Sequence, residues 1–323
     1  MILETLDLKK YFAGKQILKG ISLAIKRGEI FGIVGPDGAG KTTFIRSVLG
    51  LYRPDGGSVS LFGGAGSEYP KSRVGYVPQQ FSLNADMTVW ENIALFSRLY
   101  GLPEALWAAR AEKLLDMVWL GDFKNRLADS LSGGMKQKLA LICGVIHEPE
   151  ALFLDEPTTG VDPVSRREFW QMLYRLNRAG LTVAIATPYM DEVELCTRAA
   201  FFNQGQIRLV GAPAELLALY PYKLFAVRAD NLRLILRRTL DLPVRAAYLQ
   251  GTRLHVALDG ESGLPALEEA LAAAGLGAFA ITPVRPTLDD LFSFAAGLPG
   301  PAGPGIGRAA DLAPAAASSG GAP

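Results

Sequence analysis

The sequence predicts an α/β protein, with a doubly wound, mostly parallel sheet in residues 1–217 and a small α+β domain in residues 218–297. In the first part, short apolar runs typical of buried parallel strands alternate with helical stretches and glycine-rich turns. After Tyr220-Pro221-Tyr222 this alternation gives way to a second, shorter set of strands and helices. Residues 298–323 hold almost no large apolar side chain, so we expect this Pro/Gly/Ala tail to be disordered.

The elements of the first domain are predicted from apolar runs and capping signals. Buried strands are expected at Ile30–Val34, Arg73–Val77, Leu152–Leu154 and Thr182–Ala186. A helix is expected over residues 88–101, because Thr88 can cap its first turn while Glu91 reaches back in a capping box. A helix over residues 103–119 would place Leu106, Leu114, Leu115 and Val118 on one face.

The second domain has a mixed pattern of strands and helices. Strands are expected at residues 224–228, 253–258 and 278–284, and helices at residues 232–240 and 264–274. This order indicates a small α+β domain that is loosely ferredoxin-like.

Composition excludes several classes of protein. Lys plus Arg number 33 against 32 Asp plus Glu, and this balance argues against a general nucleic-acid binder. The two cysteines lie far apart, which favours a reducing compartment, and residues 1–12 lack the apolar core of a signal peptide. The longest apolar candidate, Leu139–Ile146, is far shorter than the roughly 18–20 residues of a spanning helix. Any link to a membrane is therefore expected through a partner.

A glycine-rich loop predicts a nucleotide site. The segment Gly35-Pro36-Asp37-Gly38-Ala39-Gly40-Lys41-Thr42-Thr43 follows one expected strand and precedes a helical stretch, as a phosphate-binding loop requires. Backbone N–H groups and the helix N-terminus favour phosphate there. Lys41 would reach the β- and γ-phosphates, and the Thr42 hydroxyl would ligate Mg²⁺.

A second motif identifies the class of nucleotide-binding protein. Leu131-Ser132-Gly133-Gly134-Met135 resembles the signature segment of the ATP-binding-cassette family, with Met135 where the family usually has Gln. The resemblance implies a P-loop cassette whose Ser132, Gly133 and Gly134 contact the ATP held by a second cassette. The donors of Ser132 at a positive helix end suit that role.

Two carboxylates follow the apolar run Ala151–Leu154. Asp155 would hold Mg²⁺ through water, and Glu156 would orient or deprotonate the attacking water. The segment Thr158–Pro163 resembles the family's loop that passes between cassettes, so Asp162 is expected to contact the site of the second cassette.

Two further segments resemble parts of the family. Val74–Gln79 looks like its glutamine loop, so Gln79 is the expected contact to Mg²⁺ and water, and the helical subdomain that receives the membrane subunit would span about residues 80–130. Phe12 aligns best with the aromatic residue that stacks on adenine, with Tyr11 as the alternative. A core role for either ring is equally consistent with the sequence.

The switch segment departs from the family pattern. The family usually has a histidine after this strand, whereas the sequence here is Thr187-Pro188-Tyr189. Proline has no side-chain donor and no N–H, so Pro188 cannot contact a γ-phosphate. Three explanations stay open: a weakened site that still binds ATP, a site in which Glu156 and water suffice, or a partner cassette that supplies the competent site.

The family resemblance covers about residues 1–217 and implies an ATPase subunit of a membrane transporter. The expected ligands are ATP and Mg²⁺, and the expected partners are an integral-membrane permease and a second cassette, identical or different. The phosphate loop, the switch segment and residues 285–292 resemble those of bacterial drug exporters, some of which have tandem cassettes, and imply a place on the cytoplasmic face of the cell membrane. The alternatives are a non-hydrolysing regulatory cassette and a cassette ATPase that acts without a membrane subunit on ribosomes or DNA.

Overall fold

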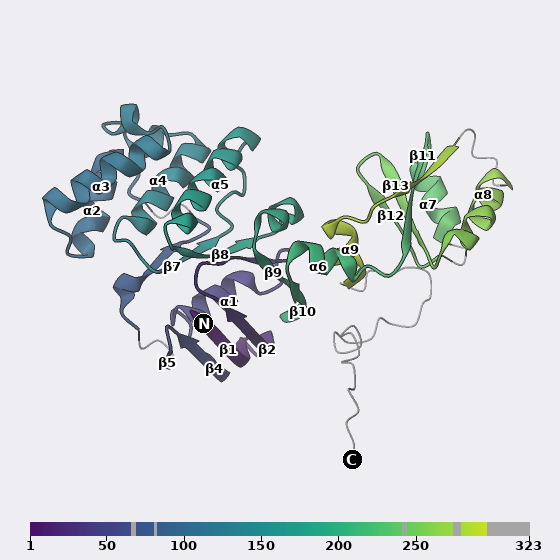
Figure 1. Ribbon diagram of the computed structural model, residues 1–323, viewed down its shortest axis with the longest axis horizontal. Helices are drawn as coiled ribbons and strands as arrows, with labels where there is room; N and C mark the ends of the chain where they lie inside the picture. The colour runs from purple at the N-terminus through teal and green to yellow at the C-terminus, as the bar shows by residue number, and fades with distance from the viewer. Residues whose placement is uncertain (66–68, 81–82, 241, 243, 274–278, 296–323) are drawn as a thin grey trace, which may run out of the picture. The chain divides into compact units, whose positions relative to one another are not determined.

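The computed structural model describes residues 1–65, 69–80, 83–240, 242, 244–273 and 279–295 (Figure 1). The chain divides into two compact units, Met1–Ala212 and Pro213 onward, which are described separately. The boundary expected at residue 217 falls inside helix α6 (Pro213–Ala218). The tail expected to be disordered lies outside the described residues.

A six-stranded sheet forms the centre of the first unit, in the order β10-β9-β3-β8-β7-β6. All but one of its strands are parallel, and β10 pairs antiparallel with β9. The four strands expected from the sequence are all present. The bounds are β3 Ile30–Val34, β6 Val74–Val77, β7 Ala151–Asp155, β8 Thr182–Thr187, β9 Arg198–Asn203 and β10 Gln206–Gly211.

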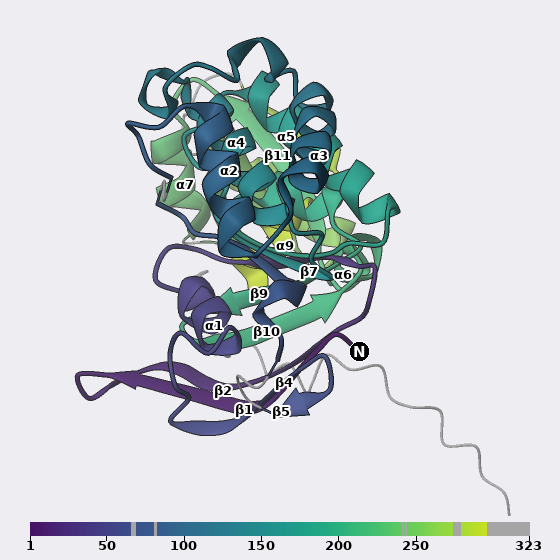
Figure 2. The same ribbon diagram turned by 90° about the vertical axis from the view of Figure 1, so that its left-hand side faces the viewer.

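A second, antiparallel sheet, which was not expected from the sequence, has the order β2-β1-β4-β5. Its strands are β1 Leu3–Phe12, β2 Lys15–Ile25, β4 Gly56–Leu61 and β5 Gly64–Ala65. One face of β1 is exposed, so its apolar residues do not form a continuous run. Helix α1 (Lys41–Val48) lies between the two sheets and buries Phe44, Ile45 and Val48 there (Figure 2).

Four helices pack on the opposite face of the large sheet (Figure 1). They are α2 Val89–Leu99, α3 Glu104–Met117, α4 Gly133–Val145 and α5 Pro163–Arg178. The capping box of α2 is confirmed, since Thr88 accepts from the N–H of Glu91 and donates its own N–H to the Glu91 carboxylate. The expectation for Leu106 is wrong: it is 42% exposed, and Trp107 occupies the core instead.

Short 3-10 turns complete the first unit, and one more occurs in the second. They are η1 Lys71–Arg73, η2 Gly121–Phe123, η3 Ala128–Ser130, η4 Met190–Leu195 and η5 Glu261–Gly263.

The second unit contains a four-stranded antiparallel sheet in the order β12-β13-β11-β14. Its elements are β11 Lys223–Ala229, α7 Leu232–Leu240, β12 Ala246–Gln250, β13 Arg253–Leu258, α8 Leu264–Ala273, β14 Phe279–Val284 and α9 Leu288–Ala295. The succession β–α–β–β–α–β is that of a ferredoxin-like domain, as the sequence suggested. Helices α7 and α8 bury Ile235, Leu267 and Leu271 against one face. No helix among the described residues of either unit is long and apolar enough to cross a bilayer.

Candidate functional site

The expected site residues follow the carboxyl ends of adjacent parallel strands. Strands β3 and β8 end together at the pair Val34–Thr187, and β7 ends beside β8 at the pair Asp155–Ala186. Strand β6 runs parallel on the other side of β7. This register brings the phosphate loop, the two carboxylates and the glutamine loop to one edge of the sheet, where α/β proteins bind their ligands.

The phosphate loop, residues 35–40, joins β3 to α1. Gly40 is the N-cap residue of α1 with a φ of 102°, a conformation that side chains rarely adopt. No side chain caps the first turn of α1, so its free N–H groups are suited to an anion. Of the predicted residues, Gly35, Ala39, Gly40 and Lys41 are buried, Thr42 and Thr43 are half-buried, and Pro36, Asp37 and Gly38 are exposed.

Lys41 folds back over the loop that precedes it. Its ammonium donates to the carbonyl oxygens of Gly35, at 2.7 Å, and Pro36, at 3.1 Å. It also forms an ion pair of 3.0 Å with Glu156 Oε1, and both side chains are buried. The phosphate-loop lysine and the expected catalytic carboxylate are therefore in direct contact.

Asp155 and Thr42 form a second contact between the loop and β7. The Thr42 hydroxyl donates to Asp155 Oδ1 at 2.9 Å, while Asp155 Oδ2 is buried without a hydrogen-bond partner among the described residues. Burial raises the pKa of Asp155, an effect that the Thr42 hydrogen bond opposes and the charge of Glu156 increases. A hydroxyl beside an unsatisfied buried carboxylate oxygen fits Mg²⁺, whose positive charge would favour the ionised form.

Glu156 connects three segments of the site. Its backbone N–H donates to Ala186 of β8 at 2.9 Å, and its φ of 51° lies in the left-handed region. Gln79 donates through Nε2 to Glu156 Oε2 at 3.0 Å, and the Thr159 hydroxyl lies 3.5 Å from the same oxygen. A strained backbone at such a position is common in functional sites, because the surrounding contacts hold it in place.

The signature segment forms the N-terminus of α4. Ser132 is the N-cap residue, and its hydroxyl accepts from the N–H of Met135 at 3.3 Å. Gly133 is exposed, whereas Gly134 is buried against α5, where an added Cβ would lie 2.4 Å from Cβ of Ser165. Gly134 is thus required for the close approach of α4 and α5. This hydrogen bond of the Ser132 side chain stays within its own helix, so its role toward a second cassette stays a prediction.

Asp162 is the N-cap residue of α5. Its carboxylate accepts from the N–H groups of Ser165, at 2.9 Å, and Val164, at 3.0 Å, and these bonds hold its pKa below the ordinary value. The side chain therefore has a structural role in addition to the contact expected from the sequence.

Phe12 lies at the end of β1, next to the hairpin turn that leads into β2. Its ring is 41% exposed and meets Tyr52 edge-on at 5.1 Å, while Tyr11 is 43% exposed. Neither ring belongs to the core, so both are accessible to a base. Stacking of adenine on Phe12 stays a prediction.

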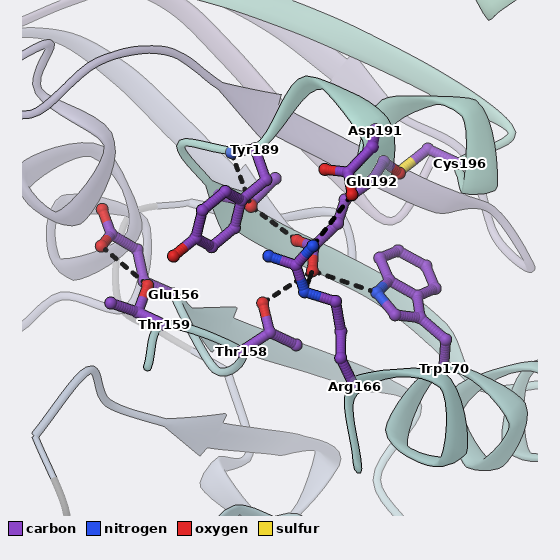
Figure 3. Close-up of polar contacts among 10 residues, drawn as sticks. Glu156, Thr158, Thr159, Arg166, Trp170, Tyr189, Asp191, Glu192 and Cys196 are labelled. Atoms are coloured by element: carbon purple, nitrogen blue, oxygen red, sulfur yellow. Dashed lines mark hydrogen bonds and ion pairs between the residues drawn. The ribbon is translucent and has the colours of Figure 1, made fainter. Parts of the chain in front are cut away.

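The switch segment belongs to a buried polar cluster that the sequence analysis missed (Figure 3). Glu192, 1% exposed, accepts from the hydroxyls of Thr158, at 2.7 Å, and Thr187, at 2.5 Å. The indole N–H of Trp170 lies 3.3 Å from Glu192 Oε1, and Arg166 Nε forms an ion pair with the same oxygen at 3.3 Å. One carboxylate thereby connects the end of β8, the loop after Glu156 and helix α5.

The sequence contains a signal for this cluster, the acidic pair Asp191-Glu192, but the signal is not specific. Glutamate is rarely buried without partners, yet nothing in Met190-Asp191-Glu192 indicates which of the two carboxylates points inward. The partners lie between five and 34 positions away along the chain, so local spacing cannot identify them.

Comparison with known proteins identifies the family of this chain. The profile of the ABC transporter family matches residues 18–159. The chain is 38% identical over 265 residues to the probable multidrug ABC transporter ATP-binding protein YbhF of Escherichia coli, covering 79% of this chain and 46% of YbhF. It therefore spans about half the length of that relative.

This chain covers a larger share of two further relatives. The linearmycin resistance ATP-binding protein LnrL of Bacillus subtilis is 36% identical over 219 residues, 67% of this chain and 70% of LnrL. The Nod factor export ATP-binding protein I of Burkholderia orbicola is 39% identical over 215 residues, 65% of this chain and 71% of that protein.

Solved structures show the same fold. The ATP-binding subunit of an ABC transporter superposes with a TM-score of 0.62 at 25% identity, covering 68% of this chain and 93% of that one. The dimeric ATP-binding cassette MJ0796 bound to ADP and Pi superposes with a TM-score of 0.59 at 26% identity, covering 65% of this chain and 98% of that one. With the phosphate loop, signature and carboxylates in place, this chain belongs to the family of ABC transporter ATP-binding proteins.

Proposed function

We propose that this protein binds ATP with Mg²⁺ and hydrolyses it to power an exporter in the membrane. The observation that carries the proposal is the meeting of Lys41, Gln79 and Glu156 at one point. Three separate segments supply these side chains: Lys41 forms an ion pair with Glu156, and Gln79 donates a hydrogen bond to it. Such convergence of a phosphate-binding cation with a carboxylate supports hydrolysis of a phosphoanhydride.

Each residue of the site has a separate role in the proposed reaction. Lys41 exchanges its contact with Glu156 for the β- and γ-phosphates, which frees that carboxylate to orient a water molecule for in-line attack on the γ-phosphorus. As the bond to the ADP oxygen breaks, Glu156 receives the proton of the attacking water, and Gln79 holds the water in place. Bound at Thr42 and Asp155, with Gln79 nearby, Mg²⁺ would neutralise charge on the phosphate oxygens.

We propose that two cassettes enclose the nucleotide. The exposed N-terminus of α4 at Ser132 and Gly133 is suited to phosphate held by another cassette, with Asp162 close to that interface. The dimeric state named for the MJ0796 cassette supports this arrangement. Closure of the dimer would move a permease attached to the segment of about residues 80–130.

Export, rather than import, is supported by the relatives. Their names describe a probable multidrug transporter, linearmycin resistance and Nod factor export. We therefore place the chain on the cytoplasmic face of the cell membrane, bound to an integral-membrane permease. Co-purification of the tagged chain with an integral-membrane protein supports this assignment, and isolation of ribosomes or DNA instead contradicts it.

A complementation experiment tests the enclosed-dimer mechanism. Lys41→Ala removes the phosphate contact, and Ser132→Arg blocks the signature, so each variant alone is expected to be inactive. In a mixed dimer, one site combines the intact phosphate loop of one chain with the intact signature of the other. An equal mixture should recover roughly a quarter of wild-type turnover, because half the dimers are mixed and each has one complete site. An active wild type without such recovery would show that this chain does not form composite sites with itself.

A regulatory cassette is the second candidate, and Pro188 is the observation that favours it. Without a side-chain donor at that position, ATP could bind and close a dimer whose competent site belongs to another cassette. Under this alternative the wild-type chain binds ATP but shows no turnover above Glu156→Gln, and it gains turnover only with a second, different cassette.

A further inference from the structure

The absence of a side-chain donor at Pro188 raises the question of which residue faces the nucleotide from the switch segment. This segment leaves β8 directly beside the phosphate loop, since Gly35 N–H donates to Thr187 O at 3.4 Å. Glu156 lies on the other side, donating its N–H to Ala186 O. The end of β8, two residues before Tyr189, therefore lies between the phosphate loop and Glu156.

We propose that Tyr189, held by Arg166, supplies the hydrogen-bond donor that Pro188 cannot. This inference rests on the proposed ATPase function and assigns one further residue to it. The phenol hydroxyl of Tyr189 would donate a hydrogen bond to an oxygen of the γ-phosphate. A donor placed there would stabilise the charge on that oxygen as water attacks.

The backbone and ring of Tyr189 are both fixed. Its N–H donates to the Thr187 hydroxyl at 3.1 Å, and the Thr187 hydroxyl in turn donates to Glu192. The Arg166 guanidinium lies 4.1 Å from the centre of the Tyr189 ring. Since cation–π contacts favour a face-on arrangement, Arg166 limits the directions in which the phenol can point.

Arg166 is itself held from two sides. It donates through Nη1 to Asp191 at 2.9 Å and forms an ion pair through Nε with Glu192 at 3.3 Å. Glu192 is buried and also accepts a hydrogen bond from Thr158. Through Glu192, the Arg166 side chain that contacts Tyr189 is therefore connected to the loop that follows Glu156. Movement of that loop would therefore be transmitted to the Tyr189 ring.

The hydroxyl of Tyr189 is the part of this cluster that is left without a contact. It has no hydrogen-bond partner among the residues that the structure describes, and the side chain is half-buried. In Figure 3 the phenol extends from the Arg166 cluster in the direction of Glu156 and Thr159. A ring held on Arg166, with an unused donor that extends in the direction of Glu156, suits a contact made only when nucleotide is present.

The deciding variant is Tyr189→Phe, which removes the hydroxyl and keeps the ring on Arg166. We expect kcat for ATP hydrolysis by the full chain to fall on the order of 10²-fold, with ATP affinity unchanged. Tyr174→Phe is the matched control, because among the described residues its hydroxyl donates to the Leu195 carbonyl and to no group of the nucleotide site. Adding Pro188→His to Tyr189→Phe should restore turnover. Wild-type kcat in Tyr189→Phe, or no recovery with Pro188→His, overturns the proposal.

If Arg166 acts by positioning Tyr189, the effect of an Arg166 substitution on kcat should depend on the Tyr189 hydroxyl. Arg166→Lys keeps the charge but loses the planar group, so we expect it to lower kcat in the wild type and to have no further effect in Tyr189→Phe. Equal losses in both backgrounds would show that Arg166 does not act through Tyr189. Glu156→Gln is measured in the same series: if wild type is no faster, the ATPase proposal itself fails, whereas an active wild type with unaffected Tyr189→Phe overturns this inference alone.

Discussion

The ammonium of Lys41 lies 3.0 Å from the carboxylate of Glu156, and their side chains are only 3% and 7% exposed. The residue expected to bind phosphate and the residue expected to activate water thus neutralise each other. Nucleotide phosphates would compete with Glu156 for Lys41. Binding of ATP and release of the catalytic carboxylate are thereby linked through one contact.

This ion pair should be visible in the stability of the protein without nucleotide. Lys41→Met leaves the Glu156 charge buried and unpaired, so we expect the free energy of unfolding to fall by about 3 kcal/mol. In the double variant Lys41→Met/Glu156→Gln, part of that loss should be recovered. Urea unfolding of the four proteins of this cycle measures the coupling, and strictly additive effects would contradict the pairing.

Asp155 is a buried carboxylate and a proposed holder of Mg²⁺. These two roles predict opposite effects of Asp155→Asn on stability and on activity. Because burial raises the pKa of Asp155, the charged carboxylate opposes folding at pH values above its folded-state pKa, and this penalty is absent below the ordinary pKa of aspartate. Asp155→Asn should therefore raise the free energy of unfolding at neutral pH without Mg²⁺. It should also lower ATP turnover roughly 10- to 100-fold, as loss of a metal-supporting group does. Lower stability of Asp155→Asn in urea would contradict the burial argument.

Glu192 is expected to be more important for stability than its neighbour. Glu192→Ala leaves Thr158, Thr187 and Trp170 without their shared acceptor, which should cost about 3 kcal/mol of unfolding free energy. Asp191→Asn is the matched control: its side chain is 69% exposed and, within the described part of the chain, pairs with Arg166, so we expect a change below about 0.5 kcal/mol. Chemical denaturation of both variants checks the ranking, and similar losses would argue against a Glu192-centred cluster.

The contact between α4 and α5 predicts a compensating pair of substitutions. In Gly134→Ala the new methyl group would lie 2.4 Å from Cβ and Oγ of Ser165, so we expect a loss of about 1–3 kcal/mol. Adding Ser165→Gly removes the clashing atoms and should recover part of that loss, although glycine in a helix costs about 1 kcal/mol by itself. Thermal unfolding compares the variants; a double variant less stable than Gly134→Ala would contradict the steric explanation.

His147 predicts a dependence of stability on pH. The ring stacks on Tyr100 at 3.6 Å, and Nε2 contacts the carbonyl of Val74 at 3.0 Å. Burial lowers the pKa of His147, so its contribution to stability is complete above the ordinary value of about 6.5 and is lost as the pH falls toward the lowered folded-state pKa. His147→Gln should therefore reduce the fall in unfolding free energy between about pH 6.5 and pH 5. Identical pH profiles for the two proteins would contradict this assignment.

The parts of the fold that could be predicted are those with local signals. The strand Ile30–Val34, the loop through Thr43 and the capping box of α2 all appear in consecutive residues. The antiparallel sheet of β1, β2 and β4 was missed because its strands have one exposed face and long-range partners. The same reason applies to β12, whose register with β13 depends on tertiary pairing.

The sequence named the residues of the candidate site, but not the contacts between them. Sequence motifs placed Lys41 and Glu156 in one site without indicating that they pair directly. The cluster around Glu192 was missed since its partners come from α5, β8 and the loop after Glu156. The substitution at Pro188 was visible in the sequence, whereas the fixed position of Tyr189 on Arg166 required the structure.

The most direct test of ATP hydrolysis by Glu156 is the rate of phosphate release by the purified full chain at saturating MgATP, compared with that of Glu156→Gln. Glu156→Gln keeps the shape of the side chain but cannot accept the proton of the attacking water. Wild type is expected to turn over ATP at least about 10²-fold faster, while both proteins bind ATP with similar affinity. Equal rates for the two proteins would contradict the claim that Glu156 makes this chain an ATPase.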